Sequence, residues 1–230
     1  MVRLMSGILV GMENGIILID KPAGMTSFGV VARIRRVLSE KAGKKVKVGH
    51  TGTLDPFATG LMILVTGTEC RNAETYSKLD KVYEATIRLG QTSTTGDPEG
   101  EITDVSELQP TNETIEAALT QFRGEIQQQP PIFSAIKIGG QRAYKLARAG
   151  KVVDMPVRTV TIHSLELVDY SYPELRIRAH VSSGTYVRTL AEDIGRSLGT
   201  GAYCVQLRRI QIANWVVADA KTLDFYGVTD

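Results

Sequence analysis

Apolar and polar residues alternate along this chain with two different periods, so that both strands and helices are expected. A β-branched, apolar run at 15–20 and an unbroken apolar run at 61–65 predict buried strands, and 82–89 alternates like a half-buried strand. Apolar residues at helical spacing predict a helix over 28–40, capped by Thr26 or Ser27 and ended by Gly43. The N-terminal part therefore has a strand–helix–strand order.

The rest of the chain continues this interleaving of strands and single helices. A polar helix is expected at about 69–78, a second at 113–122 before Gly124, and a third at 186–198 before Gly199. Strands are expected at 157–169, 174–182, 202–210 and 212–217. Residues 91–100 are interpreted as a loop in which Asp97 and Glu99 are turn residues. Short connections favour a mixed, largely antiparallel sheet of α+β type.

Composition narrows the class of protein. The chain has 230 residues, 43% of them apolar and 23% charged, which is ordinary for a folded, water-soluble protein with one substantial core or two small ones. The net charge is only +2, so that the distribution of charge says more than its sum. Basic residues are concentrated in three regions: Arg33, Arg35, Arg36, Lys41, Lys44, Lys45 and Lys47; Lys137, Arg142, Lys145, Arg148 and Lys151; Arg208 and Arg209. These clusters indicate a surface that binds phosphate groups, and a solvated helix face is the alternative interpretation.

Several classes of site are disfavoured. Cys70 and Cys204 lie far apart and fit reduced thiols of a cytoplasmic protein better than a disulfide framework. Three histidines without clustered cysteine or histidine spacing do not favour a metal site, and no apolar run has membrane-spanning length. A nucleotide-binding α/β enzyme is excluded because no phosphate-loop motif is present.

The segment from Gly49 to Gly60 carries the strongest chemical signal. Glycines punctuate it, and a single histidine and a single aspartate, His50 and Asp55, stand within it. Pro56 biases Asp55 toward extended backbone, and the apolar run that follows would anchor the loop rigidly. A turn aspartate and a solvated histidine remain the alternative. An acid on a rigidly anchored loop is nevertheless typical of a catalytic group.

Six ordered motifs resemble those of the TruB family, the tRNA pseudouridine-55 synthases. The Gly49–Gly60 segment resembles the catalytic motif of that family, in which the central aspartate is catalytic. The others lie in the family's order, from about Gly15 to Trp215: Gly15–Ser27, Asp80–Ala85, Pro130–Lys137 with Gly140–Tyr144, Ser183–Leu190, and Leu207–Arg209. The resemblance implies a pseudouridine synthase fold, with a bisected sheet and a cleft across its middle. It also implies a tRNA-gripping, thumb-like insertion at 125–155, where Pro130-Pro131, a Gly139-Gly140 turn and a short basic helix are found.

The resemblance also implies roles for individual residues. Asp55 would be the catalytic carboxylate, Arg188 its paired arginine, and Tyr83 the active-site tyrosine that stacks on the target uracil. His50 would fill the space left by the flipped uridine, since a paired base must leave its stack before chemistry. The remaining expected substrate-binding residues are Lys21, Pro22, Thr53 and Leu207 around the site, and Lys137, Arg142, Lys145 and Arg148 in the insertion.

The expected activity is isomerisation of uridine 55 in the T loop of tRNA by a monomer, with no metal, no organic cofactor and no obligatory protein partner. We expect a catalytic domain at 13–218, an N-terminal extension at 1–12 and a short tail at 219–230. The separate C-terminal RNA-binding domain usual in bacterial members is not expected. A tRNA-binding or tRNA-folding module with incidental chemistry is the main alternative, and a guide-RNA-dependent relative the second.

Overall fold

The computed structural model of the chain describes residues 13–134, 136–151 and 153–228, apart from the side chains of Tyr144 and Arg148. The chain forms two compact units: unit 1 is Met1–Lys81 with Arg208–Asp230, and unit 2 is Val82–Leu207. Strand β12 (Ala202–Ile212) contributes residues to both units. The expected extension at 1–12 lies outside the described residues.

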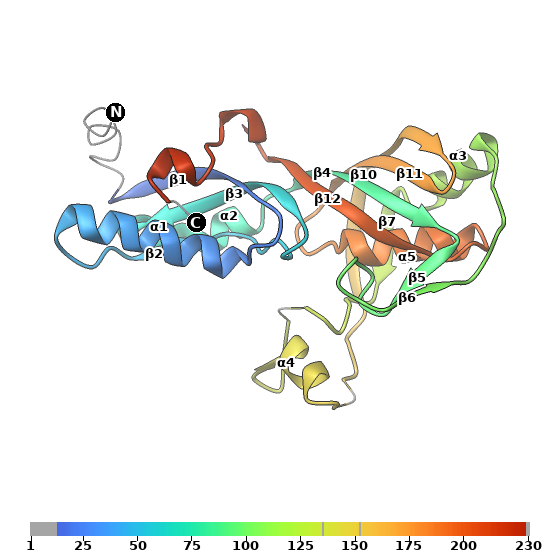
Figure 1. Ribbon diagram of the computed structural model, residues 1–230, viewed down its shortest axis with the longest axis horizontal. Helices are drawn as coiled ribbons and strands as arrows, with labels where there is room; N and C mark the ends of the chain where they lie inside the picture. Colours follow the sequence, from blue (N-terminus) through green and yellow to red (C-terminus); the bar gives the residue numbers. More distant parts are fainter. Residues whose placement is uncertain (1–12, 135, 152, 229–230) are drawn as a thin grey trace. The chain divides into compact units, whose positions relative to one another are not determined.

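Strand β3 (Thr59–Thr66) is the centre of unit 1 (Figure 1). Strand β1 (Gly15–Lys21) pairs with it antiparallel from Gly15↔Thr66 to Lys21↔Gly60. Its other edge pairs antiparallel with the short β2 (Val48–His50) and parallel with β12 at Arg208 and Arg209. The unbroken apolar run at 61–65 is explained by this position, because a central strand is buried on both faces.

Helices of unit 1 begin and end at residues suited to those positions. In α1 (Ser27–Ala42) the Thr26 side chain accepts from the Gly29 amide, and Gly43 ends the helix in the left-handed conformation at φ 62°. The α1 apolar face, with Val30 and Ile34, is buried. The remaining elements are η1 (Gly67–Asn72), α2 (Ala73–Ser77), β13 (Trp215–Val216), η2 (Val217–Asp219) and η3 (Asp224–Tyr226).

Unit 2 has a sheet in the order β12-β4-β11-β10-β7. Its further strands are β4 (Lys81–Leu89), β11 (Glu174–Val181), β10 (Arg158–Ser171) and β7 (Gly124–Gln128), and its helices are α3 (Asn112–Gln121) and α5 (Val187–Ser197). The β10–β11 and β10–β7 pairs are antiparallel. A separate hairpin joins β5 (Gln91–Ser93) to β6 (Ile102–Asp104), so the expectation of a loop from 91 is wrong for its first three residues.

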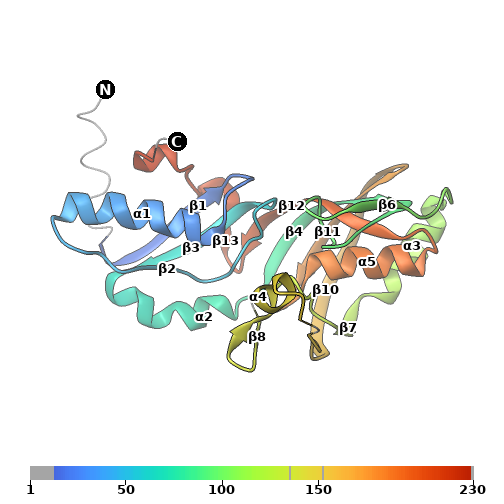
Figure 2. The ribbon, with the colours of Figure 1, turned by 60° about the horizontal axis from the view of Figure 1, so that its bottom comes forward.

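A small excursion projects from unit 2 after β7 (Figure 2). It contains the hairpin β8 (Lys137–Ile138) and β9 (Gln141–Arg142) and the helix α4 (Ala143–Arg148). The predicted Gly139-Gly140 turn joins the hairpin strands, with φ of 55° and 84°. Strand β7 itself belongs to the sheet, so the projecting part begins after Gln128.

The predicted mixed, largely antiparallel α+β fold is confirmed, with β3–β12 as a parallel pair. Each predicted helix and strand has a counterpart in the structure with ends shifted by a few residues, because end residues are fixed by capping and pairing. Among the described residues, no helix combines the length and the apolar character needed to cross a membrane.

Candidate active site

In unit 1, Ser27 holds the loop that carries Asp55 from the start of helix α1. The Ser27 hydroxyl donates to the Leu54 carbonyl at 2.8 Å and accepts from the Leu54 amide, also at 2.8 Å. Both residues are buried. A buried hydroxyl that both donates to and accepts from one residue fixes the backbone next to Asp55.

The other side of Asp55 is held by the end of strand β1. The Lys21 ammonium, which is fully buried, donates to the carbonyls of Pro22 at 2.8 Å and Pro56 at 3.1 Å. The Gly24 amide donates to the same Pro56 carbonyl at 2.8 Å. Asp55 is therefore flanked on both sides by residues whose backbone is fixed.

Asp55 also begins a turn. Its carbonyl accepts from the Ala58 amide at 3.1 Å, with Pro56 at the second turn position, where proline is favoured. The alternative interpretation of Asp55 as a turn residue is thus correct for its backbone. The Asp55 side chain is half-buried in this turn, which is compatible with a reactive carboxylate.

The remaining unit 1 candidates lie around the loop at different depths. His50 ends strand β2 and is half-buried, whereas Thr53 and Pro22 are exposed. Lys21 and Pro22 also line a cavity of about 350 Å³ in unit 1. Arg208 lines that cavity too, and its guanidinium donates to both carboxylate oxygens of Asp20, at 3.1 and 2.8 Å.

Arg209 does not belong to a phosphate-facing basic cluster. Its side chain is 1% exposed and donates from Nε to the Leu61 carbonyl at 2.7 Å and from Nη2 to the Gly52 carbonyl at 3.2 Å. The interpretation of Arg208 and Arg209 as a basic cluster that faces either phosphate or solvent is therefore wrong for Arg209. Neighbouring side chains of a strand point to opposite faces, which is why Arg209 is buried while Arg208 is only half-buried.

Lys81 is a further buried cation of unit 1, besides Lys21 and Arg209. It is 6% exposed, and its ammonium donates to the Ser77 carbonyl at 2.7 Å and to the Leu79 carbonyl. Burial and, to a smaller extent, the nearby Arg209 lower the pKa of Lys81 to about 8, and Asp80 partly opposes them. An ammonium with so low a pKa loses its charge close to neutral pH.

This shift predicts a pH dependence of stability. The pKa of Lys81 lies below its ordinary value of 10.5, so that between about pH 8 and 10.5 the unfolded chain binds the extra proton. The free energy of unfolding should therefore rise with pH across this window, by at most about 3 kcal/mol. Urea unfolding at pH 7.5 and 10 measures the increment.

Two variants separate Lys81 from the other groups that titrate in this range. Lys81→Met should lose the increment, and Lys78→Met should keep it, since Lys78 is exposed and paired with Glu74. An equal increment in both variants would assign it to another group.

In unit 2, Arg188 is the centre of a buried polar network. It lies in the first turn of α5, is 3% exposed, and donates from Nη1 to Asp97 Oδ2 at 3.0 Å and to the Thr95 carbonyl at 2.7 Å. Its Nη2 donates to the carbonyl of Phe133, a residue of the excursion, at 2.9 Å. Sequence analysis missed Asp97, which is buried as an ion-pair partner as well as being a turn residue.

A glutamine fixes the start of α5. The Gln128 side chain donates to the Tyr186 carbonyl at 3.0 Å and accepts from the Tyr186 amide at 2.8 Å. This two-way bond ties strand β7 to the residue before α5 and so helps to position Arg188. Tyr83 on β4 and Leu207 on β12 are both buried in unit 2.

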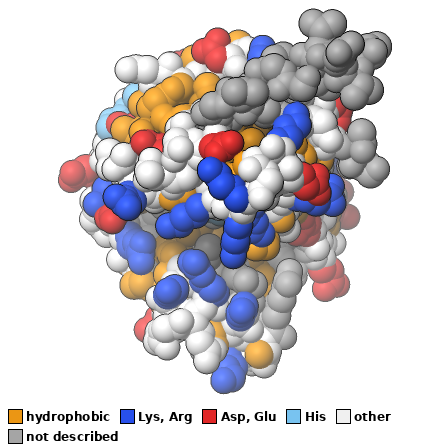
Figure 3. Space-filling view, turned by 90° about the vertical axis from the view of Figure 1, so that its left-hand side faces the viewer, with side chains coloured by type: hydrophobic (Ala, Val, Ile, Leu, Met, Phe, Trp, Pro, Cys, Tyr) orange, Lys and Arg blue, Asp and Glu red, His pale blue; other side chains and the backbone are white. Residues whose placement is uncertain are grey.

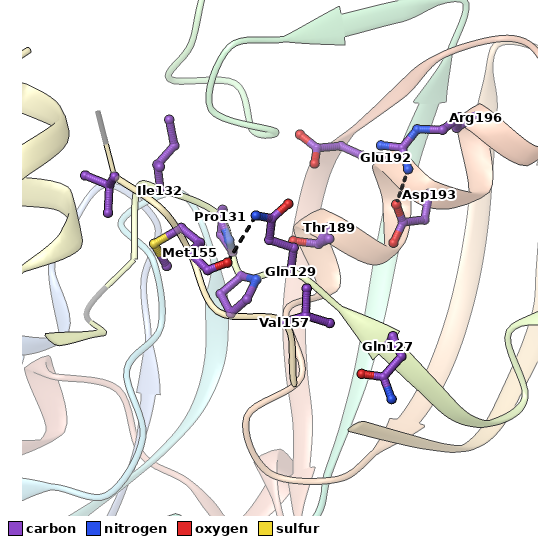
Figure 4. Close-up of a pocket in the computed structure, with 12 residues that line it drawn as sticks. Gln127, Gln129, Pro131, Ile132, Met155, Val157, Thr189, Glu192, Asp193 and Arg196 are labelled. Atoms are coloured by element: carbon purple, nitrogen blue, oxygen red, sulfur yellow. Dashed lines mark hydrogen bonds and ion pairs between the residues drawn. The ribbon is translucent and has the colours of Figure 1, made fainter. Parts of the chain in front are cut away.

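The described basic residues of the excursion face solvent. Lys137, Arg142 and Lys145 are exposed, and the Arg148 side chain lies outside the description. At the base of the excursion, a pocket of about 500 Å³ has Pro131 and Met155 on one side and Glu192 and Asp193 of α5 on the other (Figure 4). Burial raises the pKa of both acids, and Arg188 opposes this at Glu192.

Basic residues also gather on a surface of unit 1. Arg36, Lys41, Lys44, Lys45 and Lys47 are exposed at and after the end of helix α1. A space-filling view of one face of the molecule shows many Lys and Arg side chains close together (Figure 3). Such a concentration of positive charge suits a polyanionic ligand.

Comparison with known families decides the family of this chain. The N-terminal domain model of the TruB family pseudouridylate synthases matches residues 35–187, and the C-terminal domain model of tRNA pseudouridylate synthase B matches 188–226. The chain belongs to the TruB family. The predicted family is thereby confirmed, and the TruB motifs are those that build the loop of unit 1 and the α5 network of unit 2.

Individual relatives agree with this assignment. The chain is 45% identical over 211 residues to a tRNA pseudouridine synthase B of Azoarcus sp. and 45% over 217 residues to one of Burkholderia lata. These alignments cover 92% and 94% of this chain but 69% and 66% of the relatives. The chain therefore spans about two thirds of the length of these TruB proteins.

Solved structures give the same fold. A chain of a Cbf5–Nop10–Gar1 complex matches with a TM-score of 0.70 and 28% identity, over 94% of this chain and 56% of that one. A chain of an H/ACA ribonucleoprotein bound to a substrate RNA containing 2′-deoxyuridine matches at 0.67 and 25%, over 97% and 54%. This TruB chain thus spans just over half of each structural neighbour.

Proposed function

We propose that this TruB protein isomerises uridine 55 in the T loop of tRNA to pseudouridine, with Asp55 as the catalytic carboxylate. The observation that carries the proposal is the fixed loop around Asp55. Ser27 and Lys21 hold the flanking carbonyls of Leu54 and Pro56. Preorganisation of this kind is what positions a reactive group within a fraction of an ångström.

The reaction needs no change of oxidation state. The N1–C1′ glycosidic bond breaks, a C5–C1′ bond forms, C5 loses a proton and N1 gains one. An ionised carboxylate can start this sequence by attack on C1′, by attack on C6, or by removal of the 2′ proton. All three routes use the chain's own carboxylate, so we infer a reaction without metal or organic cofactor.

The other candidates then take supporting roles. The target uridine must leave its pairing within the folded T loop before it reacts, and His50 would occupy the vacated space. Tyr83 would stack on the extruded uracil and Leu207 would pack against it. The Arg188 guanidinium would stabilise the ionised form of the catalytic carboxylate, because guanidinium remains charged at all relevant pH values.

Curated relatives favour tRNA as the substrate over a guide-dependent RNA. The relatives at 45% identity carry the name tRNA pseudouridine synthase B, whereas the structural match at 28% identity is a chain of a Cbf5–Nop10–Gar1 complex. We infer that this chain acts as a cytoplasmic monomer on the T arm, without an obligatory protein partner. A purely tRNA-folding module is the alternative that activity assays must exclude.

Substrate choice can be tested with an isolated T-arm stem-loop. We expect the protein to convert the T-loop uridine of the stem-loop to pseudouridine, identified by mass spectrometry of the digested RNA. A stem-loop with cytidine at that position should gain no pseudouridine elsewhere. Pseudouridine at another uridine, or only in RNA supplied with a guide strand, would contradict the proposed substrate.

The excursion should supply phosphate contacts. Replacing Arg142 and Lys145 by glutamine should weaken tRNA binding. It should also reduce the slope of log K, where K is the association constant, against log salt concentration by about one to two, because binding with fewer phosphate contacts releases fewer counterions. Arg176→Gln on β11 is a matched control, since it removes an exposed arginine of unit 2 outside the excursion. An unchanged slope in the double variant would remove the excursion from the RNA interface.

A further inference from the structure

Two buried cations of unit 1, Arg209 and Lys81, have no role in the proposal so far. Arg209 is 1% exposed and Lys81 6% exposed. In the described part of the chain neither forms an ion pair, and their side-chain hydrogen bonds run to main-chain carbonyls. Burying a charge without a paired anion costs several kcal/mol, so the two positions need a physical reason.

Arg209 bridges the two ends of the segment that carries Asp55. Its Nη2 donates to the carbonyl of Gly52, three residues before Asp55, and its Nε donates to the carbonyl of Leu61, six residues after it. One planar guanidinium thus fixes both ends of the loop at once. The fork geometry of its donors makes this bridge specific to arginine.

The backbone of Arg209 engages the same segment. It pairs with Gly60 in the parallel β12–β3 ladder. A Cβ atom at Gly60, where φ is 103°, would lie 2.3 Å from the Arg209 carbonyl oxygen, so that only glycine fits. Main chain and side chain of Arg209 therefore both fix where the loop enters strand β3.

Lys81 is a second cationic side chain that borders the start of this loop. A Cβ atom on Gly52 would lie 3.4 Å from Arg209 Nη1 and 4.0 Å from Lys81 Cε, so that both cationic side chains border Gly52. The Lys81 ammonium is anchored by carbonyls of Ser77 and Leu79. Asp80 is the acidic group that acts on Lys81, and Arg209 is the basic one.

We propose that Arg209 and Lys81 are positioning residues of this enzyme: Arg209 fixes the geometry of the loop bearing Asp55, and the two buried charges favour the ionised Asp55 carboxylate. This inference rests on the proposed role of Asp55. It explains why buried cations stand behind a catalytic loop without ion-pair partners of their own. Asp80 offsets part of the charge of Lys81, and the remaining positive potential acts on the loop.

Charge and geometry can be tested separately. Arg209→Lys keeps the charge but cannot donate to both carbonyls in the same arrangement, so kcat should fall by about 10- to 100-fold with KM changed less than about threefold. Hydrogen exchange of the amides at 51–61 should become faster in this variant. Unchanged kcat and unchanged exchange in a folded Arg209→Lys protein would overturn the positioning role.

Lys81→Met removes the second charge while nearly keeping the side-chain shape. The acid limb of the kcat–pH profile should move to higher pH, by about one unit if the charge lies about 10 Å from the carboxylate. Lys81→Arg should restore the wild-type limb, and Lys78→Met should leave it unmoved. An acid limb identical in wild type and Lys81→Met would overturn the electrostatic role.

Wild type and Asp55→Asn are assayed in the same series on tRNA. An active wild type and an inactive Asp55→Asn establish the proposed function, so that the Arg209 and Lys81 variants then test only this inference. An inactive wild type, or an active Asp55→Asn, would overturn the proposed function and this inference with it. Thermal melts of every variant separate loss of folding from loss of kcat.

Discussion

Asp55→Asn should abolish turnover while tRNA binding remains nearly intact. The amide is close to the carboxylate in size, so the turn closed by the Asp55 carbonyl and the Ala58 amide should persist. It can act neither as a nucleophile nor as a base, and loss of such a group lowers kcat by at least about 10⁴-fold. Single-turnover kinetics on unmodified tRNA measure the loss.

The control for this variant is the affinity for tRNA. Filter binding should give Kd values within about threefold of wild type, because the carboxylate is one small part of a large interface. Parallel loss of binding and turnover would instead give Asp55 a structural role. Residual activity above about 1% of wild type would require another catalytic group.

Asp97→Ala should strongly destabilise unit 2. The Asp97 carboxylate accepts from Arg188 at 3.0 Å, from the Thr95 hydroxyl at 2.6 Å and from the Glu99 amide at 3.0 Å. Removing it leaves the buried Arg188 guanidinium without this anion, which costs about 3–5 kcal/mol in comparable pairs. Urea unfolding monitored by circular dichroism measures the change in the free energy of unfolding.

An exposed ion pair of the same unit provides the matched comparison. Arg178 donates to Glu84 at 2.7 Å, but both side chains are partly in solvent. Glu84→Ala should therefore cost at most about 1 kcal/mol. Equal costs for Asp97→Ala and Glu84→Ala would contradict the account of Arg188 as the centre of a buried network.

Asp97→Asn separates charge from hydrogen bonding at the same site. The amide oxygen can still accept from the Thr95 hydroxyl or the Glu99 amide, so the turn should be retained. The loss of stability that remains in Asp97→Asn then measures the contribution of the negative charge of Asp97 beside Arg188. If Arg188 supports catalysis as proposed, kcat should fall in this variant as well.

The elements of the fold follow from local sequence, because periodicity, capping and turn residues act over a few positions. Thr26 and Gly43 bound α1 as their residue types require, and Gly139-Gly140 forms the expected turn. The hairpin of β5 and β6 was missed, since three-residue strands are too short to show a period.

The contacts that build the candidate site were harder to foresee. Asp97 and Arg188 are 91 residues apart, and Arg209 and Gly52 are 157 apart, so no local pattern pairs them. The sequence pattern indicates a turn residue at Asp97 and a member of a basic cluster at Arg209, and both residues are buried. Arg209 stands in an apolar-alternating strand, and that alternation is the one signal that could have indicated its burial.

The central claim is most directly tested by tritium release from tRNA transcripts labelled at C5 of uridine, since forming the C5–C1′ bond expels that proton. Wild-type protein should release tritium from tRNA with uridine at position 55 of the T loop. Release should be lost when that uridine is replaced by cytidine. No release from tRNA that the protein still binds would contradict the account and favour a tRNA-folding module.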